Sequence, residues 1–140
     1  MNEDKIRDKI IRDLELKNIN VVNLRRGSFD LIIEGIRPFI CEIKQITKGG
    51  HRGFKEDEKG FSFTEPQTNE IPKMKFPPFV VAYYKNDFYF FNPKWIKKHV
   101  TELNKEYKYR RAILYDSIRH FPSAKNYNDI LLEIIKFVAE

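Results

Sequence analysis

The sequence predicts a single α/β domain in which a central mixed β-sheet is flanked by helices. Two observations lead to this fold class: helical and strand-like hydrophobic patterns alternate along the chain, and no internal repeat or low-complexity tract interrupts them. The length of 140 residues is that of one domain, so residues 1–140 are expected to fold as one unit.

The first element is predicted to be a helix over residues 3–17. Ile6, Ile10 and Leu14 follow one another at intervals of four residues, and charged side chains fill most of the positions between them. This spacing places the apolar side chains on one face of a helix, which is expected to pack against the sheet.

Strands are expected next. A β-prone run at residues 18–24 leads into a basic turn at 25–28. Two apolar segments follow, residues 29–33 and residues 39–46, and the short connection 34–38 between them contains glycine and proline. This order predicts a β-hairpin.

The second half of the chain is predicted to begin with a loop over residues 47–62, which contain four glycines and a run of charges. Thr64 is expected to cap a helix that Pro72 keeps short. The remaining predicted elements are a hairpin of strands 79–84 and 88–91, a helix opening at Asn92 and Pro93, a strand near 112–115 and an amphipathic helix over 127–139.

The composition restricts the possible classes of protein. Hydrophobic residues make up 41% and charged residues 33% of the chain, which is typical of a folded domain rather than a disordered tail or a fibre. No apolar run approaches the roughly 20 residues that cross a bilayer, and the charged N-terminus does not resemble a signal peptide. With Cys41 as its one cysteine, the chain has no intrachain disulfide, so we expect a cytoplasmic protein without membrane contact.

The charge of the chain favours a nucleic-acid partner. Lysine and arginine number 26 against 20 acidic residues, which gives a net charge of +6. Basic residues are concentrated in residues 94–111, where they alternate with aromatic side chains that can stack on bases. The alternative interpretation of that segment is an ordinary solvated face.

Asp30, Glu42 and Lys44 form the sharpest chemical pattern in the sequence. Because side chains alternate along a strand, Glu42 and Lys44 share one face of the second strand of the predicted hairpin. Asp30 is expected to point away from the apolar face of the first strand, so the hairpin can bring all three together. A plain cross-strand ion pair at a solvent-facing edge is the alternative.

Two neighbouring carboxylates repel each other, and a divalent cation relieves that repulsion. Oxygen ligands favour Mg²⁺ or Mn²⁺, and the main-chain carbonyl of Ile43 is a further candidate ligand. Such a metal can activate a water molecule and neutralise charge on a phosphate. Lys44 would then orient or deprotonate the water, or stabilise charge in the transition state.

The segments 28–33 (SFDLII) and 39–44 (FICEIK) resemble the core motif of the PD-(D/E)XK nuclease superfamily, whose fold is called restriction-endonuclease-like. Within that superfamily the chain is most similar to the archaeal Holliday-junction resolvases, over about residues 3–93. Phe29 stands where the family has a proline. The resemblance implies a Mg²⁺-dependent endonuclease that hydrolyses DNA phosphodiester bonds at particular DNA structures, as a homodimer and without a small-molecule cofactor.

The resemblance also implies further site residues. A third carboxylate is expected on the first helix, and Glu3 is the candidate because it lies in the direction of the apolar stripe; its alternative role is to favour the helix dipole. A polar residue is expected on the helix after the second strand. Gln67 is that candidate, with capping or surface exposure as the alternative. His51 is a weaker candidate for phosphate contact or proton transfer.

Four basic residues flank the predicted site and are expected to hold DNA phosphates without sequence preference. They are Arg25, Arg26, Lys48 and Arg52. One face of the aromatic hairpin over residues 79–91 is expected to meet a second subunit. Two other functions remain open, a type II restriction-like endonuclease and a non-catalytic nucleic-acid-binding module.

Overall fold

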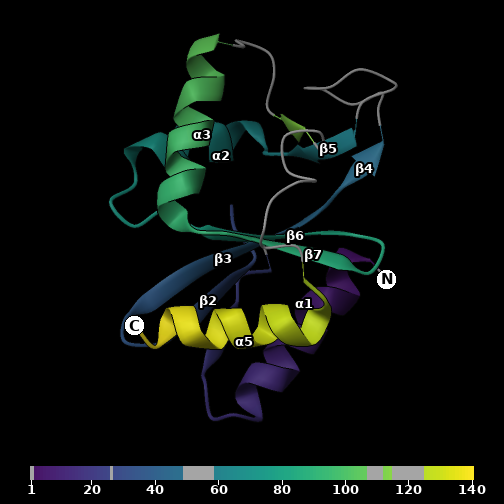
Figure 1. Cartoon of the computed structure of the whole chain (residues 1–140). Coiled ribbons are helices and arrows are strands. Elements are labelled where there is room, and N and C mark those ends of the chain that lie inside the picture. The colour runs from purple at the N-terminus through teal and green to yellow at the C-terminus, as the bar shows by residue number, and fades with distance from the viewer. Residues whose placement is uncertain (1, 26, 49–58, 107–111, 115–124) are drawn as a thin grey trace.

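A computed structural model of the chain describes residues 2–25, 27–48, 59–106, 112–114 and 125–140. Helices cover both faces of a central sheet, so the structure has three layers (Figure 1). The elements are α1 (Glu3–Glu15), β1 (Val21–Asn23), β2 (Leu31–Glu34), β3 (Pro38–Gln45), β4 (Thr47–Lys48), β5 (Lys59–Ser62), α2 (Glu65–Glu70), the 3-10 helix η1 (Ile71–Lys73), β6 (Phe79–Tyr84), β7 (Asp87–Phe91), α3 (Pro93–Glu106), β8 (Ala112–Leu114) and α5 (Tyr127–Val138).

The described residues form a five-stranded central sheet with the order β1-β2-β3-β6-β7. β3 and β6 are parallel, and the other neighbouring strands are antiparallel. A parallel pair needs a crossover connection, and here it passes through β5, α2 and η1 on one face. The predicted α/β domain with a mixed sheet is therefore confirmed. β4, β5 and β8 make a separate three-stranded antiparallel sheet.

Side chains that alternate along the central strands divide between two hydrophobic cores. The first core contains Phe39, Cys41 and Ile43 of β3, together with the buried faces of α1 and α5. The second core lies on the opposite face, under α3, η1 and β5, and it includes Val80 and Ala82 of β6. The side chains of Glu42 and Lys44 therefore point towards the face that carries the second core.

The helix boundaries agree with the capping residues that the sequence offers. Asn2 accepts a hydrogen bond from the Lys5 amide at the start of α1. Thr64 caps α2, which ends at Glu70 just before Pro72, as predicted. None of the helices in the described part of the chain combines the length and apolar character that crossing a membrane requires.

The predicted strand over residues 29–33 begins two residues late. β2 starts at Leu31, and Phe29 and Asp30 lie in a bend before it. Phe29 consequently packs in the second core, whereas Leu31 and Ile33 are in the first. The alternation of side chains between the two faces applies only to residues within a strand. Phe29 lies before β2, so alternation wrongly placed its side chain on the face of Leu31 and Ile33.

The loop predicted over residues 47–62 contains two strands at its ends, β4 and β5. Phe61 is buried in the second core, and its strand pairs with β8 from much later in the chain. Glycines normally indicate a loop, but this distant pairing partner and one core side chain stabilise a strand at Gly60 and Phe61.

The expectation that one face of the hairpin over residues 79–91 meets a second subunit is not supported. Residues of β6 and β7 are buried on both faces. The hairpin lies between the α3 layer and the α5 layer, which cover one face each (Figure 1). The aromatic side chains are therefore core, and this hairpin gives no exposed face for a dimer.

The connection between β2 and β3 packs directly on the end of α5. A Cβ atom added at Gly35 would lie 2.0 Å from the Val138 carbonyl oxygen, and the Ile36 amide donates to that same oxygen over 2.9 Å. Only glycine permits this approach of the two backbones.

We predict that Gly35→Ala lowers the free energy of unfolding by about 1–3 kcal/mol, because either the hydrogen bond or the α5 contact must shift. The measurement is urea denaturation. Gly27→Ala is the matched control, since a Cβ atom there would meet no atom closer than 3.4 Å. Equal stability of the two variants would contradict the argument.

Candidate active site

The candidate site lies where β2 and β3 separate. The pairing of the two strands ends at Leu31 and Cys41, and β3 continues beyond that point beside β6. The next β3 amide on the side of β2, that of Ile43, donates to Asp30 Oδ2 over 2.8 Å. The Asp30 carboxylate thus replaces the missing strand partner, which fixes its position against β3.

Glu3 makes the same kind of contact one step further along. The Gln45 amide donates to Glu3 Oε1 over 2.8 Å, although the Glu3 side chain is otherwise exposed. The first turn of α1 is therefore attached to the end of β3, and the expectation that Glu3 faces the sheet agrees with this position. One of its oxygens is committed to the backbone.

Glu42 is buried beside Asp30, with 5% of its surface exposed. Burial raises the pKa of Glu42 to about 9; a hydrogen bond to Asp30 and the charges of Asp30 and Glu3 add to the increase, while the Lys44 charge opposes it. At neutral pH and without a cation, Glu42 therefore keeps its proton and donates it towards the Asp30 carboxylate.

Gln67 connects the residues of the site. Its Nε2 donates to Glu42 Oε2 and to the Ser28 carbonyl oxygen, and its Oε1 accepts from the Thr64 amide and from Lys44 Nζ. Because two acceptors surround the nitrogen and two donors surround the oxygen, one orientation of the amide satisfies all four contacts. Gln67 is 3% exposed, so the surface alternative is wrong and the capping alternative is correct.

Lys44 lies on the same face as Glu42, as strand alternation predicted. Its Nζ is 3.0 Å from Gln67 Oε1 and 5.3 Å from the centre of the Phe63 ring. The side chain is half-buried, and the remaining two N–H donors of the ammonium group can serve another acceptor. The site therefore contains two carboxyl groups in contact and one oriented cation.

The basic residues that the sequence placed near the site are only partly described. Arg25 is exposed, one residue after Leu24, whose amide donates to the Asp30 carbonyl oxygen over 2.9 Å. Arg26, His51 and Arg52 lie outside the described residues, as does the side chain of Lys48 in β4. Their predicted contacts with DNA stay predictions.

Sequence reasoning missed Arg7. Its Nη1 lies 3.9 Å from Asp30 Oδ1, and its Nη2 lies 3.0 Å from Asp4. One signal could have found it: Arg7 follows Glu3 by four residues, so the two share a face of α1, and Glu3 was already expected to face the site. The hydrogen bond from Gln67 to the main-chain carbonyl of Ser28 could not be predicted, because every residue has such a carbonyl.

Within the described part of the chain, no group of three or more histidine, cysteine, aspartate or glutamate residues is arranged to hold a metal ion. Asp30 and Glu42 form a pair, and Glu3 is attached to the backbone instead of completing a triad. Any metal bound here would need main-chain or water oxygens as further ligands.

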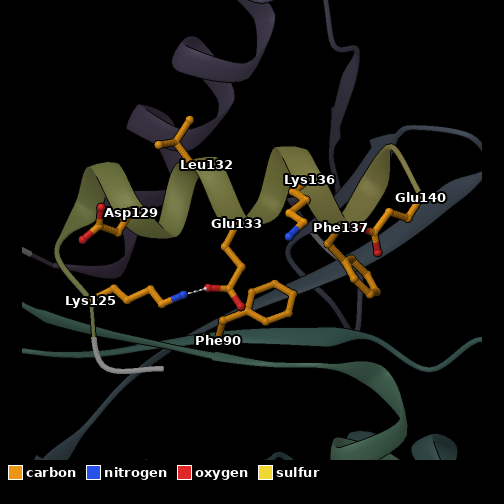
Figure 2. A pocket seen from close by; sticks show the side chains of 8 residues that line it. All are labelled: Phe90, Lys125, Asp129, Leu132, Glu133, Lys136, Phe137 and Glu140. Carbon is orange, nitrogen blue, oxygen red and sulfur yellow. Dashed lines mark hydrogen bonds and ion pairs between the residues drawn. The ribbon is translucent and has the colours of Figure 1, made fainter. Parts of the chain in front are cut away.

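A groove of about 520 Å³ lies away from these residues, between β7 and α5 (Figure 2). Phe90 and Phe137 line it together with a rim of both charge signs that includes the Lys125–Glu133 ion pair. It lies on the face of the central sheet that carries the first core, opposite the side chains of Glu42 and Lys44. The groove is thus separate from the candidate site.

No family model matches the chain, and no curated protein matches it. The solved structure of a bacterial homing endonuclease, I-Ssp6803I, is similar to it over 96% of this chain and 89% of that chain. The sequence identity is 15% and the TM-score is 0.48. A likeness at this level does not assign an activity to this chain.

The raised pKa of Glu42 predicts that stability depends on pH. The folded state holds a proton on Glu42 up to about pH 9, whereas the unfolded chain loses it near the ordinary value of 4.5. The stabilising contribution is therefore complete below about pH 4.5 and is lost as pH rises through 9. Between these limits, without metal, unfolding free energy should fall by up to about 1.4 kcal/mol per pH unit.

Glu42→Gln mimics the protonated acid and should remove most of this slope. The measurement is urea denaturation in EDTA between about pH 5.5 and 8.5. Glu34→Gln, which changes an exposed carboxyl group at the far end of β2, should retain the wild-type slope. Identical slopes for the wild type and Glu42→Gln would show that Glu42 ionises normally.

Proposed function

We propose that this chain is a divalent-metal-dependent nuclease that hydrolyses phosphodiester bonds in DNA. The contact between the carboxyl groups of Glu42 and Asp30, with Lys44 oriented by Gln67 on the same face, supports the proposal most strongly. A structural ion pair would not need a buried acid in contact with a second, partly buried acid. Two acids that share a proton are poised to exchange it for a cation.

The oxygens around Asp30 fit a small, hard cation. Asp30 Oδ2 accepts from the Ile43 amide and Glu42 Oε2 accepts from Gln67, which leaves the second oxygen of each carboxyl group for a metal. Within a strand the N–H and C=O of one residue point the same way, so the Ile43 carbonyl also faces the side of Asp30. Oxygen ligands of this kind select Mg²⁺ or Mn²⁺.

When bound, such a cation supplies an activated water molecule and charge neutralisation at the phosphate. The chain's own residues do the remaining work. Gln67 holds the Glu42 carboxyl group in place and presents the Lys44 ammonium group on the same face. Lys44 then orients the attacking water or stabilises the negative charge that develops on the phosphate oxygens.

DNA is the substrate class that the charge distribution favours. The net charge is +6, and Arg25 is exposed directly after Leu24, whose amide donates to the Asp30 carbonyl oxygen. Lys94 and Lys98 are exposed on α3, on the same face of the sheet as Glu42. Lysine and arginine in such positions neutralise phosphates and give affinity without sequence preference. We propose a structure-specific endonuclease of the Holliday-junction-resolvase type.

We predict that the 140-residue chain binds Mn²⁺ and cleaves DNA in Mg²⁺ or Mn²⁺. Glu42→Ala and Lys44→Ala should each reduce cleavage by at least about 100-fold, and Glu42→Ala should also weaken Mn²⁺ binding. Glu34→Ala is the matched control because it removes an exposed carboxylate at the other end of β2. Calorimetry measures metal binding, and gel assays measure cleavage.

The DNA panel separates the possible subtypes. Four-way junction, linear duplex, flap and single-stranded DNA are each incubated with and without Mg²⁺. Preferential cutting of the junction supports the resolvase type, whereas cutting of one duplex sequence would indicate a restriction-like enzyme. If the wild type and Glu42→Ala bind Mn²⁺ equally and neither cuts any DNA, the protein is not a nuclease of this kind.

A further inference from the structure

Arg7 places a positive charge beside the Asp30 oxygen that the backbone does not use. Asp30 Oδ2 is 2.8 Å from the Ile43 amide nitrogen, and Arg7 Nη1 is 3.9 Å from Oδ1. Both side chains are mostly buried, with 24% of Arg7 and 23% of Asp30 exposed. The guanidinium group therefore faces the oxygen that the proposed function gives to a divalent cation.

The contact has the character of an ion pair rather than a closed hydrogen bond. A separation of 3.9 Å exceeds hydrogen-bond distance. Arg7 Nε is buried without a hydrogen-bond partner among the described residues and lies 3.9 Å from Asp8 Oδ1. The nearest acid to Arg7, Asp4, is 75% exposed, and Asp8 is 71% exposed. Arg7 is thus held beside Asp30 mainly by charge, and a stronger cation can displace it.

We propose that Arg7 is a positioning residue that neutralises Asp30 while no divalent cation is bound and gives up the Oδ1 oxygen when one binds. The inference rests on the proposed metal-dependent function and adds a competing charge within the chain. Arg7 lowers the affinity of the site for the cation, and in return its positive charge offsets the negative charge of Asp30 when the cation is absent.

The direction in which removal of Arg7 changes the metal affinity distinguishes this role from a purely structural role, in which Arg7 only holds α1 and Asp30 in position. A brace holds Asp30 in position, so removing it weakens metal binding. A competing cation repels the metal, so removing it strengthens metal binding. One positive charge about 6 Å from a divalent ion is worth about a factor of ten in affinity at the dielectric of water, and more where the site is partly shielded from solvent.

The test is calorimetric titration of the 140-residue chain with Mn²⁺ in the absence of DNA. Arg7→Gln should lower the Kd for Mn²⁺ by at least about tenfold, and Arg7→Lys, which keeps the charge, should remain within about threefold of the wild type. Arg12→Gln is the matched control: it removes the same charge from the same helix at an exposed position beside Asp13.

A second measurement does not involve metal. In EDTA, Arg7→Gln should destabilise the protein by urea denaturation, and a double-mutant cycle with Asp30→Asn should show that the two effects are not additive. Arg7→Met, which retains the aliphatic stem, replaces Arg7→Gln in both measurements if the latter does not fold.

Each outcome decides the proposal. Tighter Mn²⁺ binding by Arg7→Gln alone supports it. Equal or weaker binding by Arg7→Gln, with normal binding by the wild type, overturns it and leaves the nuclease proposal intact. The same gain in Arg12→Gln also overturns it, because net charge would then be the cause. Failure of the wild type to bind Mn²⁺ removes both proposals.

Discussion

The contact between the Asp30 and Glu42 carboxyl groups is the constraint on which the rest of the site depends. Two acids can meet inside a protein only if a proton, a cation or strong donors compensate for burial and repulsion. This chain supplies all three kinds of compensation: a raised pKa on Glu42, amide donors from Ile43 and Gln67, and the positive charges of Lys44 and Arg7.

The fold provides these groups from three separate elements. β3 supplies Glu42 and Lys44, the crossover helix α2 supplies Gln67, and the first turns of α1 bring Glu3 and Arg7 to the end of β3. β2 begins late, at Leu31, which leaves the β3 amides of Ile43 and Gln45 free to bind Asp30 and Glu3. If the β2–β3 ladder continued in the same register, Phe29 and Gly27 would pair with Ile43 and Gln45. The backbone would then satisfy those amides and leave the carboxylates without their anchors.

Local patterns were sufficient to predict Glu42 and Lys44 on one face, because alternation is a property of the strand itself. Asp30 lies beside Glu42 as predicted, but for a different reason. It precedes β2 and does not belong to the strand, and a hydrogen bond from the Ile43 amide holds its carboxylate in place. The burial of Gln67 and the approach of Arg7 depend on the crossover and on helix docking, which bring together residues 23 or more positions apart. No short sequence window contains that information.

Gln67 shows why structural and chemical roles overlap at this site. Its side chain closes the capping box of α2 with Thr64 and at the same time holds Glu42 and Lys44. A substitution at position 67 that keeps the helix cap but removes the amide nitrogen leaves Glu42 without its hydrogen-bond donor. A substitution that removes the whole side chain also removes the cap of α2. Loss of activity at position 67 therefore does not by itself identify a catalytic role, whereas Lys44 can be truncated without removing a helix cap.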